Sequence, residues 1–158
     1  MTSIGDIALD AAYVYWTDGS AVMRAPSAGG NSVALAAAPG STGFVAVADG
    51  SLYWIAVDAQ NSNLMKVSTT GGASTLLASI PATIQDMAVD ATSVYLVIPT
   101  GNPDGSGALW KVPADGGTPT TIASGTDVSG PIAVNATKVF WMDDSNGAYT
   151  WVESAAKN

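Results

Sequence analysis

The amino-acid sequence predicts an all-β protein made of four similar antiparallel units. The first observation is an aromatic residue that recurs inside a short apolar run, at Tyr15, Tyr53, Tyr95 and Phe140. The second is a pair of glycines that follows in three of the units, at Gly29-Gly30, Gly71-Gly72 and Gly116-Gly117. The third is the absence of any window with a sustained helical apolar period. Repetition with coincident turn signals indicates one small motif used four times.

Each unit contains four short runs rich in Val, Ile, Tyr and Trp, bounded by turn-forming residues. In the first unit these runs are Ile7–Leu9, Tyr13–Trp16, Val22–Pro26 and Ser32–Leu35. Runs of this length and composition are typical of strands joined by hairpin-sized connections. A repeat of about 40 residues with four antiparallel strands is typical of a β-propeller blade. We therefore expect one propeller-type domain over 1–158, with blades at 5–38, 43–79, 85–125 and 130–158, the last lacking its outer strand.

The composition excludes several classes of active site. The chain of 158 residues has no Cys and no His, which removes disulfides, Cys-ligated metals and His-dependent nucleophilic catalysis. Five basic residues against 13 acidic ones give a net charge of −8. A chain this acidic repels phosphate backbones and anionic lipid surfaces, so we expect neither nucleic acid nor membrane as a partner. No uncharged apolar run is long enough to span a bilayer.

The acidic residues are predicted to gather at one end of the blades. Successive loops of a meander alternate between two ends, and the loops between the second and third strands share one end with the linkers. This end receives eight acidic residues and no Lys or Arg, namely Asp6, Asp18, Asp58, Asp86, Asp104, Asp127, Asp143 and Asp144. Such a face attracts cations or basic partners, more weakly at high salt. The alternative interpretation is that these side chains cap their own turns.

Two groups of candidate site residues follow from this placement. The predicted binding-face residues are Asp18, Asp86 and Asp127. The candidate calcium ligands are Asp58, Asp104, Asp143 and Asp144, which lie in oxygen-rich segments. None of these segments completes a twelve-residue calcium loop of the EF-hand type. Arg24, Lys66 and Lys111 lie on the third strands, where we expect them to extend over outer apolar surface.

One tetrapeptide and one longer segment carry a resemblance to known families. Tyr15-Trp16-Thr17-Asp18 spells YWTD, and the segment 87–125 is similar to repeats of bacterial propeller proteins. The chain resembles YWTD/NHL-type β-propellers. The resemblance implies a propeller of six to eight blades and favours an extracellular or periplasmic location. These families include binding modules, scaffolds and lactonases that hold calcium with Glu and Asn or Asp. Glu153 is the chain's one Glu, so no catalytic residue is carried over.

The four units do not determine how many blades the complete propeller ring contains. We expect two chains to form one eight-bladed ring as a homodimer, with a four-bladed monomer as the alternative. A third possibility is that the chain is a fragment or an engineered piece of a longer propeller. For function, the sequence favours a non-catalytic scaffold or binding module for a protein, peptide or glycan. The alternative is a calcium-dependent hydrolase of the lactonase type.

Overall fold

The structure is a computed structural model that describes residues 6–38, 40–99, 107–125, 128–143 and 151–157. Strands and turns make up all of these residues, and none of them is helical. The chain divides into two compact units, Met1–Pro81 and Ala82–Asn158, each described here by itself. The all-β fold predicted from the sequence is confirmed.

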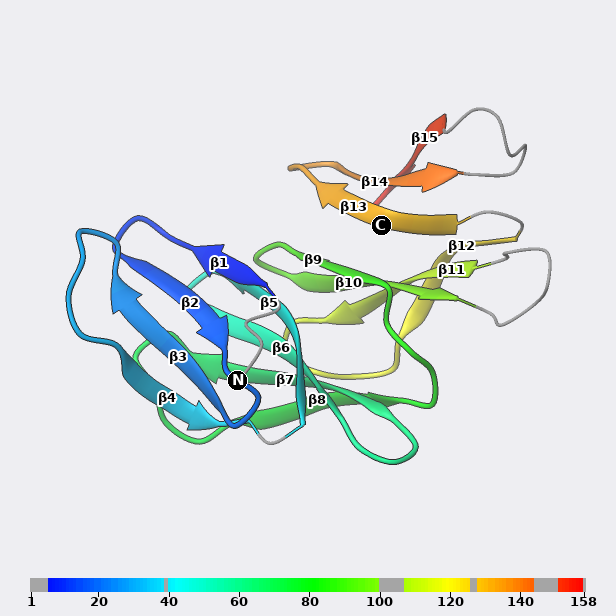
Figure 1. Ribbon diagram of the computed structural model, residues 1–158. Helices are drawn as coiled ribbons and strands as arrows, with labels where there is room; N and C mark the ends of the chain where they lie inside the picture. The colour runs from blue at the N-terminus through cyan, green and yellow to red at the C-terminus, as the bar shows by residue number, and fades with distance from the viewer. Residues whose placement is uncertain (1–5, 39, 100–106, 126–127, 144–150, 158) are drawn as a thin grey trace. The chain divides into compact units, whose positions relative to one another are not determined.

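Unit 1, Met1–Pro81, contains two four-stranded antiparallel sheets with neighbouring strands in chain order (Figure 1). The first sheet consists of β1 (Ile7–Leu9), β2 (Tyr13–Thr17), β3 (Ala21–Pro26) and β4 (Val33–Ala37). The second consists of β5 (Ser41–Ala48), β6 (Ser51–Val57), β7 (Ser62–Ser68) and β8 (Thr75–Ile80). The hairpin between β5 and β6 turns on two residues with positive φ, Asp49 and Gly50, as a tight turn between twisted strands requires.

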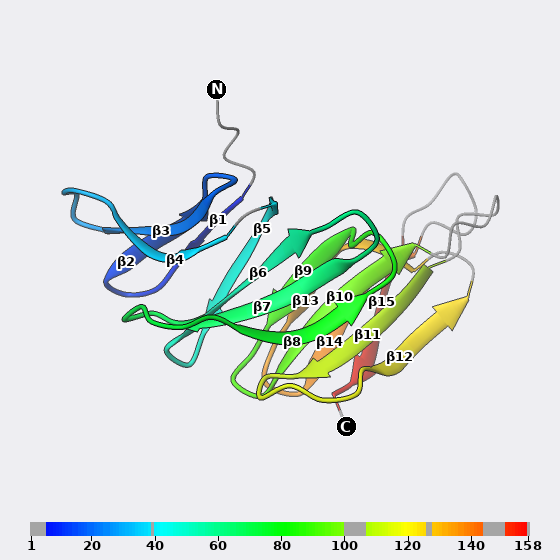
Figure 2. The same ribbon diagram turned by 90° about the horizontal axis from the view of Figure 1, so that it is seen from below.

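Unit 2, Ala82–Asn158, contains one four-stranded and one three-stranded antiparallel sheet, whose strands overlap in Figure 2. The four-stranded sheet consists of β9 (Asp86–Val89), β10 (Ser93–Pro99), β11 (Gly107–Pro113) and β12 (Thr120–Gly125). The other sheet consists of β13 (Val128–Val134), β14 (Lys138–Asp143) and β15 (Trp151–Ala156).

The core of unit 1 lies between its two sheets. Because strand side chains alternate, Tyr15 and Val22 leave the first sheet on the side that faces Leu52 and Trp54 of the second. The buried members of this core are Tyr15, Val22, Leu35, Ala38, Val45, Leu52, Trp54 and Val67. Both sheets contribute to one continuous apolar layer, so neither covers its own apolar face alone.

Unit 2 repeats this arrangement with equivalent residues. Tyr95, Val97 and Leu109 of the four-stranded sheet pack against Val128, Val139 and Trp141 of the three-stranded sheet. Tyr95 occupies the register position in its sheet that Tyr15 occupies in the first, opposite a third-strand cation in each case. Two of the recurring aromatic residues found in the sequence, Tyr15 and Tyr95, therefore serve sheet-on-sheet packing, one in each unit.

Two buried tyrosines each donate a hydrogen bond from the hydroxyl to an aspartate that lies five residues earlier in the sequence. The Tyr15 hydroxyl donates to Asp10 Oδ2 at 2.7 Å, and the Tyr95 hydroxyl donates to Asp90 Oδ2 at 3.1 Å. The other oxygen of each carboxylate accepts backbone N–H groups of the turn that follows. In the last sheet Asn135 caps the same turn and Phe140, which has no hydroxyl, replaces the tyrosine.

Two further aspartates connect neighbouring sheets inside each unit. Asp6 accepts the N–H of its own neighbour Ile7 at 2.7 Å and that of Val45 in the second sheet at 3.3 Å. Asp86 in unit 2 does the same with Met87 at 2.8 Å and Ile132 at 2.7 Å. These carboxylates fix the first strand of one sheet against the first strand of the next, because a half-buried backbone N–H needs an acceptor.

Third-strand cations also reach across to the next sheet, so the expectation that Arg24 and Lys111 extend over outer apolar surface is wrong. The Arg24 guanidinium lies 4.5 Å from the centroid of the Tyr13 ring and donates to the carbonyl of Thr69 in the second sheet. Lys111 donates to the carbonyl of Lys157 in unit 2. Thr69 and Lys157 each follow directly after the third strand of their sheet, so the two contacts are equivalent.

We predict that Tyr15→Phe lowers the free energy of unfolding by about 1–2 kcal/mol, because it removes a buried hydrogen bond to a charged acceptor. The measurement is urea unfolding followed by tryptophan fluorescence. The matched control is Tyr13→Phe, since the Tyr13 hydroxyl makes no hydrogen bond to the residues that the structure describes. Equal losses in the two variants would contradict the assignment.

Candidate binding groove

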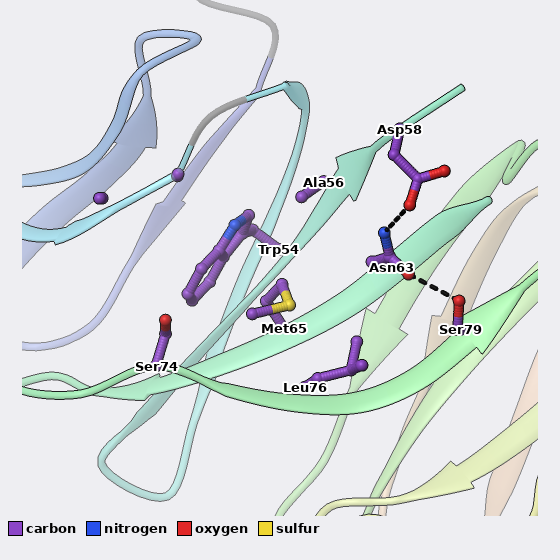
Figure 3. Close-up of a pocket in the computed structure, with 10 residues that line it drawn as sticks. Trp54, Ala56, Asp58, Asn63, Met65, Ser74, Leu76 and Ser79 are labelled. Carbon is purple, nitrogen blue, oxygen red and sulfur yellow. Dashed lines mark hydrogen bonds between the residues drawn. The ribbon is translucent and has the colours of Figure 1, made fainter. Parts of the chain in front are cut away.

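A groove of about 510 Å³ opens inside unit 1 between the end of β4 and the face of β6, β7 and β8 (Figure 3). Its lining residues come from both sheets, namely Ala37, Ala38, Trp54, Ala56, Asp58, Asn63, Met65, Ser74, Leu76 and Ser79. Small side chains at the end of β4 create it, because Ala37, the last residue of the strand, and Ala38, which follows it, leave uncovered the space above the larger residues of the second sheet.

The floor of the groove is apolar. Trp54 and Met65 are register partners on β6 and β7, so their side chains leave the sheet on the same side. Leu76 on β8 pairs with Met65 and extends this surface, and its side chain is 53% exposed. An aromatic ring beside a thioether and an exposed leucine provides an adaptable apolar surface for a ligand group.

One end of the groove is polar. Asn63 donates through Nδ2 to Asp58 Oδ2 at 2.8 Å and accepts through Oδ1 from the Ser79 hydroxyl at 2.7 Å (Figure 3). Asp58 Oδ1 accepts the N–H groups of Gln60 and Asn61, and these bonds, the one from Gln60 foremost, lower the pKa of the exposed Asp58 carboxyl. The end of the groove therefore carries a full negative charge at neutral pH.

Trp54 contributes an unused donor. The side chain is 1% exposed, and its Nε1 has no hydrogen-bond partner among the described residues. A buried N–H without an acceptor costs free energy, since it has lost water and gained nothing in return.

The structure places two of the predicted site residues in structural roles and a third in the groove. Asp18 lies in the β2–β3 turn, where its Oδ1 accepts the N–H groups of Ser20 and Ala21 at 2.9 and 2.8 Å. These bonds, with that of Ser20 the largest, lower the pKa of the Asp18 carboxyl. Asp86 connects two sheets of unit 2, as described above, and Asp58 is the one predicted residue that lines the groove.

Four of the predicted residues are not brought into any described site. Asp104, Asp127 and Asp144 lie outside the described residues, and Asp143 is described only as the last residue of β14. Within the described part of the chain, no group of three or more carboxylates gathers as a metal site would need. The calcium site stays a prediction. The described residues form no helix, and so none that is long and apolar enough to cross a membrane.

Unit 2 has a polar cluster of its own, beside the turn between β9 and β10. Lys157 Nζ contacts Asp90 Oδ2 at 2.5 Å, in a hollow of about 470 Å³ that Asn135 also lines. Burial raises the pKa of the Asp90 carboxyl, but hydrogen bonds from Lys157, Thr92 and Tyr95 outweigh it, and the pKa falls well below the ordinary range. The same environment, burial first and the Asp90 charge next, raises the pKa of Tyr95 to about 12.

Sequence reasoning missed the groove and the tyrosine–aspartate pairs. The signal for the pairs was present, because Asp and Tyr recur five residues apart at Asp10/Tyr15 and Asp90/Tyr95, and both change together to Asn135/Phe140. The groove had no such signal. It depends on alanines of one sheet lying across from Trp54 of another.

Comparisons with known proteins support the fold class. No protein-family model matches the chain, and no curated protein matches it. Solved structures do match. A putative TolB from Agrobacterium tumefaciens has a TM-score of 0.68 at 13% identity, over 92% of this chain and 54% of that one. The tricorn protease has a TM-score of 0.66 at 14% identity, over 96% of this chain and 15% of that one.

A third match is a putative 6-phosphogluconolactonase from Bacteroides uniformis. It has a TM-score of 0.56 at 15% identity, over 98% of this chain and 50% of that one. TolB and the tricorn protease contain β-propellers, so the chain has a propeller-type fold of antiparallel sheets. The chain spans about half the length of the first structure and under a sixth of the second.

We predict that stability falls as the pH drops through the acidic range. The pKa values of Asp10, Asp18, Asp58 and Asp90 are all lowered from 3.8 in the fold, so the unfolded chain binds more protons there. This stability is present above about pH 4 and is lost as the pH falls toward the folded-state values. Urea midpoints measured from pH 6 downward should show it.

The Asp90→Asn variant should flatten this pH dependence more than Asp18→Asn does. Asp90 is half-buried and paired with Lys157, whereas Asp18 bonds only its own exposed turn. A pH dependence that is the same in Asp90→Asn as in the unmodified chain would contradict the role of the Asp90 cluster.

Proposed function

We propose that the chain is a non-catalytic binding module of the propeller type, and that its groove in unit 1 takes an apolar group next to a cation. The observation that carries the proposal is the groove itself, an apolar floor of Trp54, Met65 and Leu76 beside the anionic Asp58. Ligand sites are commonly apolar hollows with a few polar groups that fix orientation. Peptide segments with leucine and lysine or arginine side by side have this chemistry.

The charge of the chain supports a basic ligand. A net charge of −8 favours encounter with cationic segments, with a rate that falls as salt screens the field. Described carboxylates such as Asp10, Asp86 and Asp90 are occupied by backbone or side-chain donors of the fold. This engagement favours binding over acid–base catalysis, which needs a carboxylate available to a substrate.

The finer family assignment and the location belong to the same proposal. YWTD lies at the end of β2, where Tyr15 is a core residue and Asp18 caps the turn, in keeping with a structural role for the motif. We assign the chain to YWTD/NHL-type propellers on this basis. The resemblance favours an extracellular or periplasmic location.

Fluorescence anisotropy with a labelled peptide that alternates leucine and lysine tests the groove. Leu76→Asn removes exposed apolar surface from the floor and should weaken binding by about tenfold. Asp58→Asn should weaken it less, and its effect should vanish at high salt. Val33→Asn is the matched control, because Val33 is similarly exposed at 49% and does not line the groove. Binding that is insensitive to Leu76→Asn, or absent, would contradict the proposal.

The second candidate is a calcium-dependent hydrolase of the lactonase type. The likeness to a putative 6-phosphogluconolactonase favours it at the level of fold. Calcium added to the metal-free chain, with magnesium as control, separates the two functions. A binding module should show no calcium-specific heat and no rise in unfolding temperature. A calcium-specific rise that Asp143→Asn or Asp144→Asn abolishes would favour the hydrolase.

A further inference from the structure

The first sheet leaves one apolar face uncovered. Ile7 and Leu9 on β1 are 61% and 69% exposed, and their register partners on β2 are Trp16 and Val14. Register partners share a face, so these four residues form one surface, called here the leading face. The opposite face of the same sheet carries Tyr15, which is buried in the core of unit 1.

The last sheet of unit 2 also has an uncovered apolar face. Val152 on β15 is 68% exposed and pairs with Met142 on β14, and Phe140 pairs with Ala133 on β13. Together with Pro131, these residues line an apolar hollow of about 210 Å³. They are called here the trailing face. Val139 and Trp141, which alternate with them along β14, are buried in the core of unit 2.

The repeat makes the two faces complementary. In unit 1 the face that carries Ala8 and Tyr15 covers the face that carries Leu52 and Trp54 of the next sheet. Phe140 and Ala133 of the trailing face pair with each other as Tyr15 and Ala8 do. The leading face carries Val14 and Trp16 at the repeat positions of Leu52 and Trp54, so the two faces have the residues of the two sides of the contact inside unit 1.

The trailing face also lacks the polar groups of the internal contacts. Arg24 lies opposite Tyr15 and Lys111 opposite Tyr95, whereas Ser154 lies opposite Phe140. Pro131 occupies the position of the inter-sheet carboxylates Asp6 and Asp86, directly before the residue equivalent to Ile7. Without those groups the trailing face is apolar around Phe140, Met142 and Val152, and Lys138 lies at its margin, where it donates to the Ser154 hydroxyl. An exposed apolar patch of this kind suits a covered interface better than a solvated surface.

We propose that the trailing face of one chain packs against the leading face of a second copy, head to tail. Two chains related by a two-fold axis then make this contact twice, so that both leading faces and both trailing faces are covered. This interface is separate from the ligand groove and does not depend on it, since Trp54 and Leu76 belong to neither face.

Light scattering coupled to size-exclusion chromatography measures the mass directly. The proposal predicts twice the chain mass of 15.8 kDa across a wide range of protein concentration. A mass of one chain at all concentrations would overturn it. Leu9→Glu and Val152→Glu each introduce a charge into both copies of the contact, and each should halve the measured mass.

Two controls keep the result interpretable. Val33→Glu adds a charge to β4 of the first sheet, on the face where Leu35 is a core residue, and should leave the mass unchanged. Circular dichroism and the unfolding midpoint establish that each variant still folds. A variant set in which Val152→Glu dissociates the dimer and Leu9→Glu does not would indicate a symmetric contact of trailing faces and would refute the head-to-tail arrangement.

Mixing the two monomeric variants gives a further discriminating result. The trailing face of the Leu9→Glu chain and the leading face of the Val152→Glu chain are both unmodified, so one intact contact forms between them. The mixture should recover the mass of two chains, whereas each variant alone does not. Failure to recover it would count against complementary faces.

Discussion

In each unit two sheets meet through apolar faces, and this constraint governs the rest of the structure. A four-stranded sheet of short strands cannot cover itself, so it must lie against another sheet. In unit 1 the two sheets meet through Tyr15 and Val22 on one side and Leu52 and Trp54 on the other. In unit 2 the equivalent contact uses Tyr95 and Leu109 against Val139 and Trp141. Apolar contact of this kind is strong, but it is non-directional and does not by itself fix the register of one sheet against the other.

Hydrogen bonds at the margins of the apolar layer fix how the two sheets of a unit are oriented against each other. Asp86 fixes the first strands of two sheets against each other through Ile132, while Lys111 and Lys157 act at the third strands. Only 11% of the residues are charged, and Asp6, Arg24, Asp86 and Lys111 are among those that connect neighbouring sheets. The ligand groove lies where such contacts are absent, above Trp54 and beneath the alanines of β4.

The strands were predictable from the sequence and the contacts between sheets were not. Apolar runs around Tyr15 and Tyr95 have the length and turn signals of strands, which is local information. The reach of Arg24 to Thr69 depends on the distance between two sheets, which no local pattern contains. Asp18 and Asp58 lie in loops between second and third strands, as expected, but they bond their own turns first, as Asp commonly does. Of the candidate calcium ligands, only Asp58 lies in the described groove.

Hydrogen exchange in a Leu52→Ala variant tests most directly whether neighbouring sheets share one core. Leu52 is fully buried on β6, and its truncation should cost about 2–5 kcal/mol. Because the side chain packs in a layer that Tyr15 and Val22 complete, protection should fall in β2 and β3 of the first sheet as well as in β6 and β7. A loss of protection confined to β5–β8 would show that the sheets are stable independently and would contradict this account.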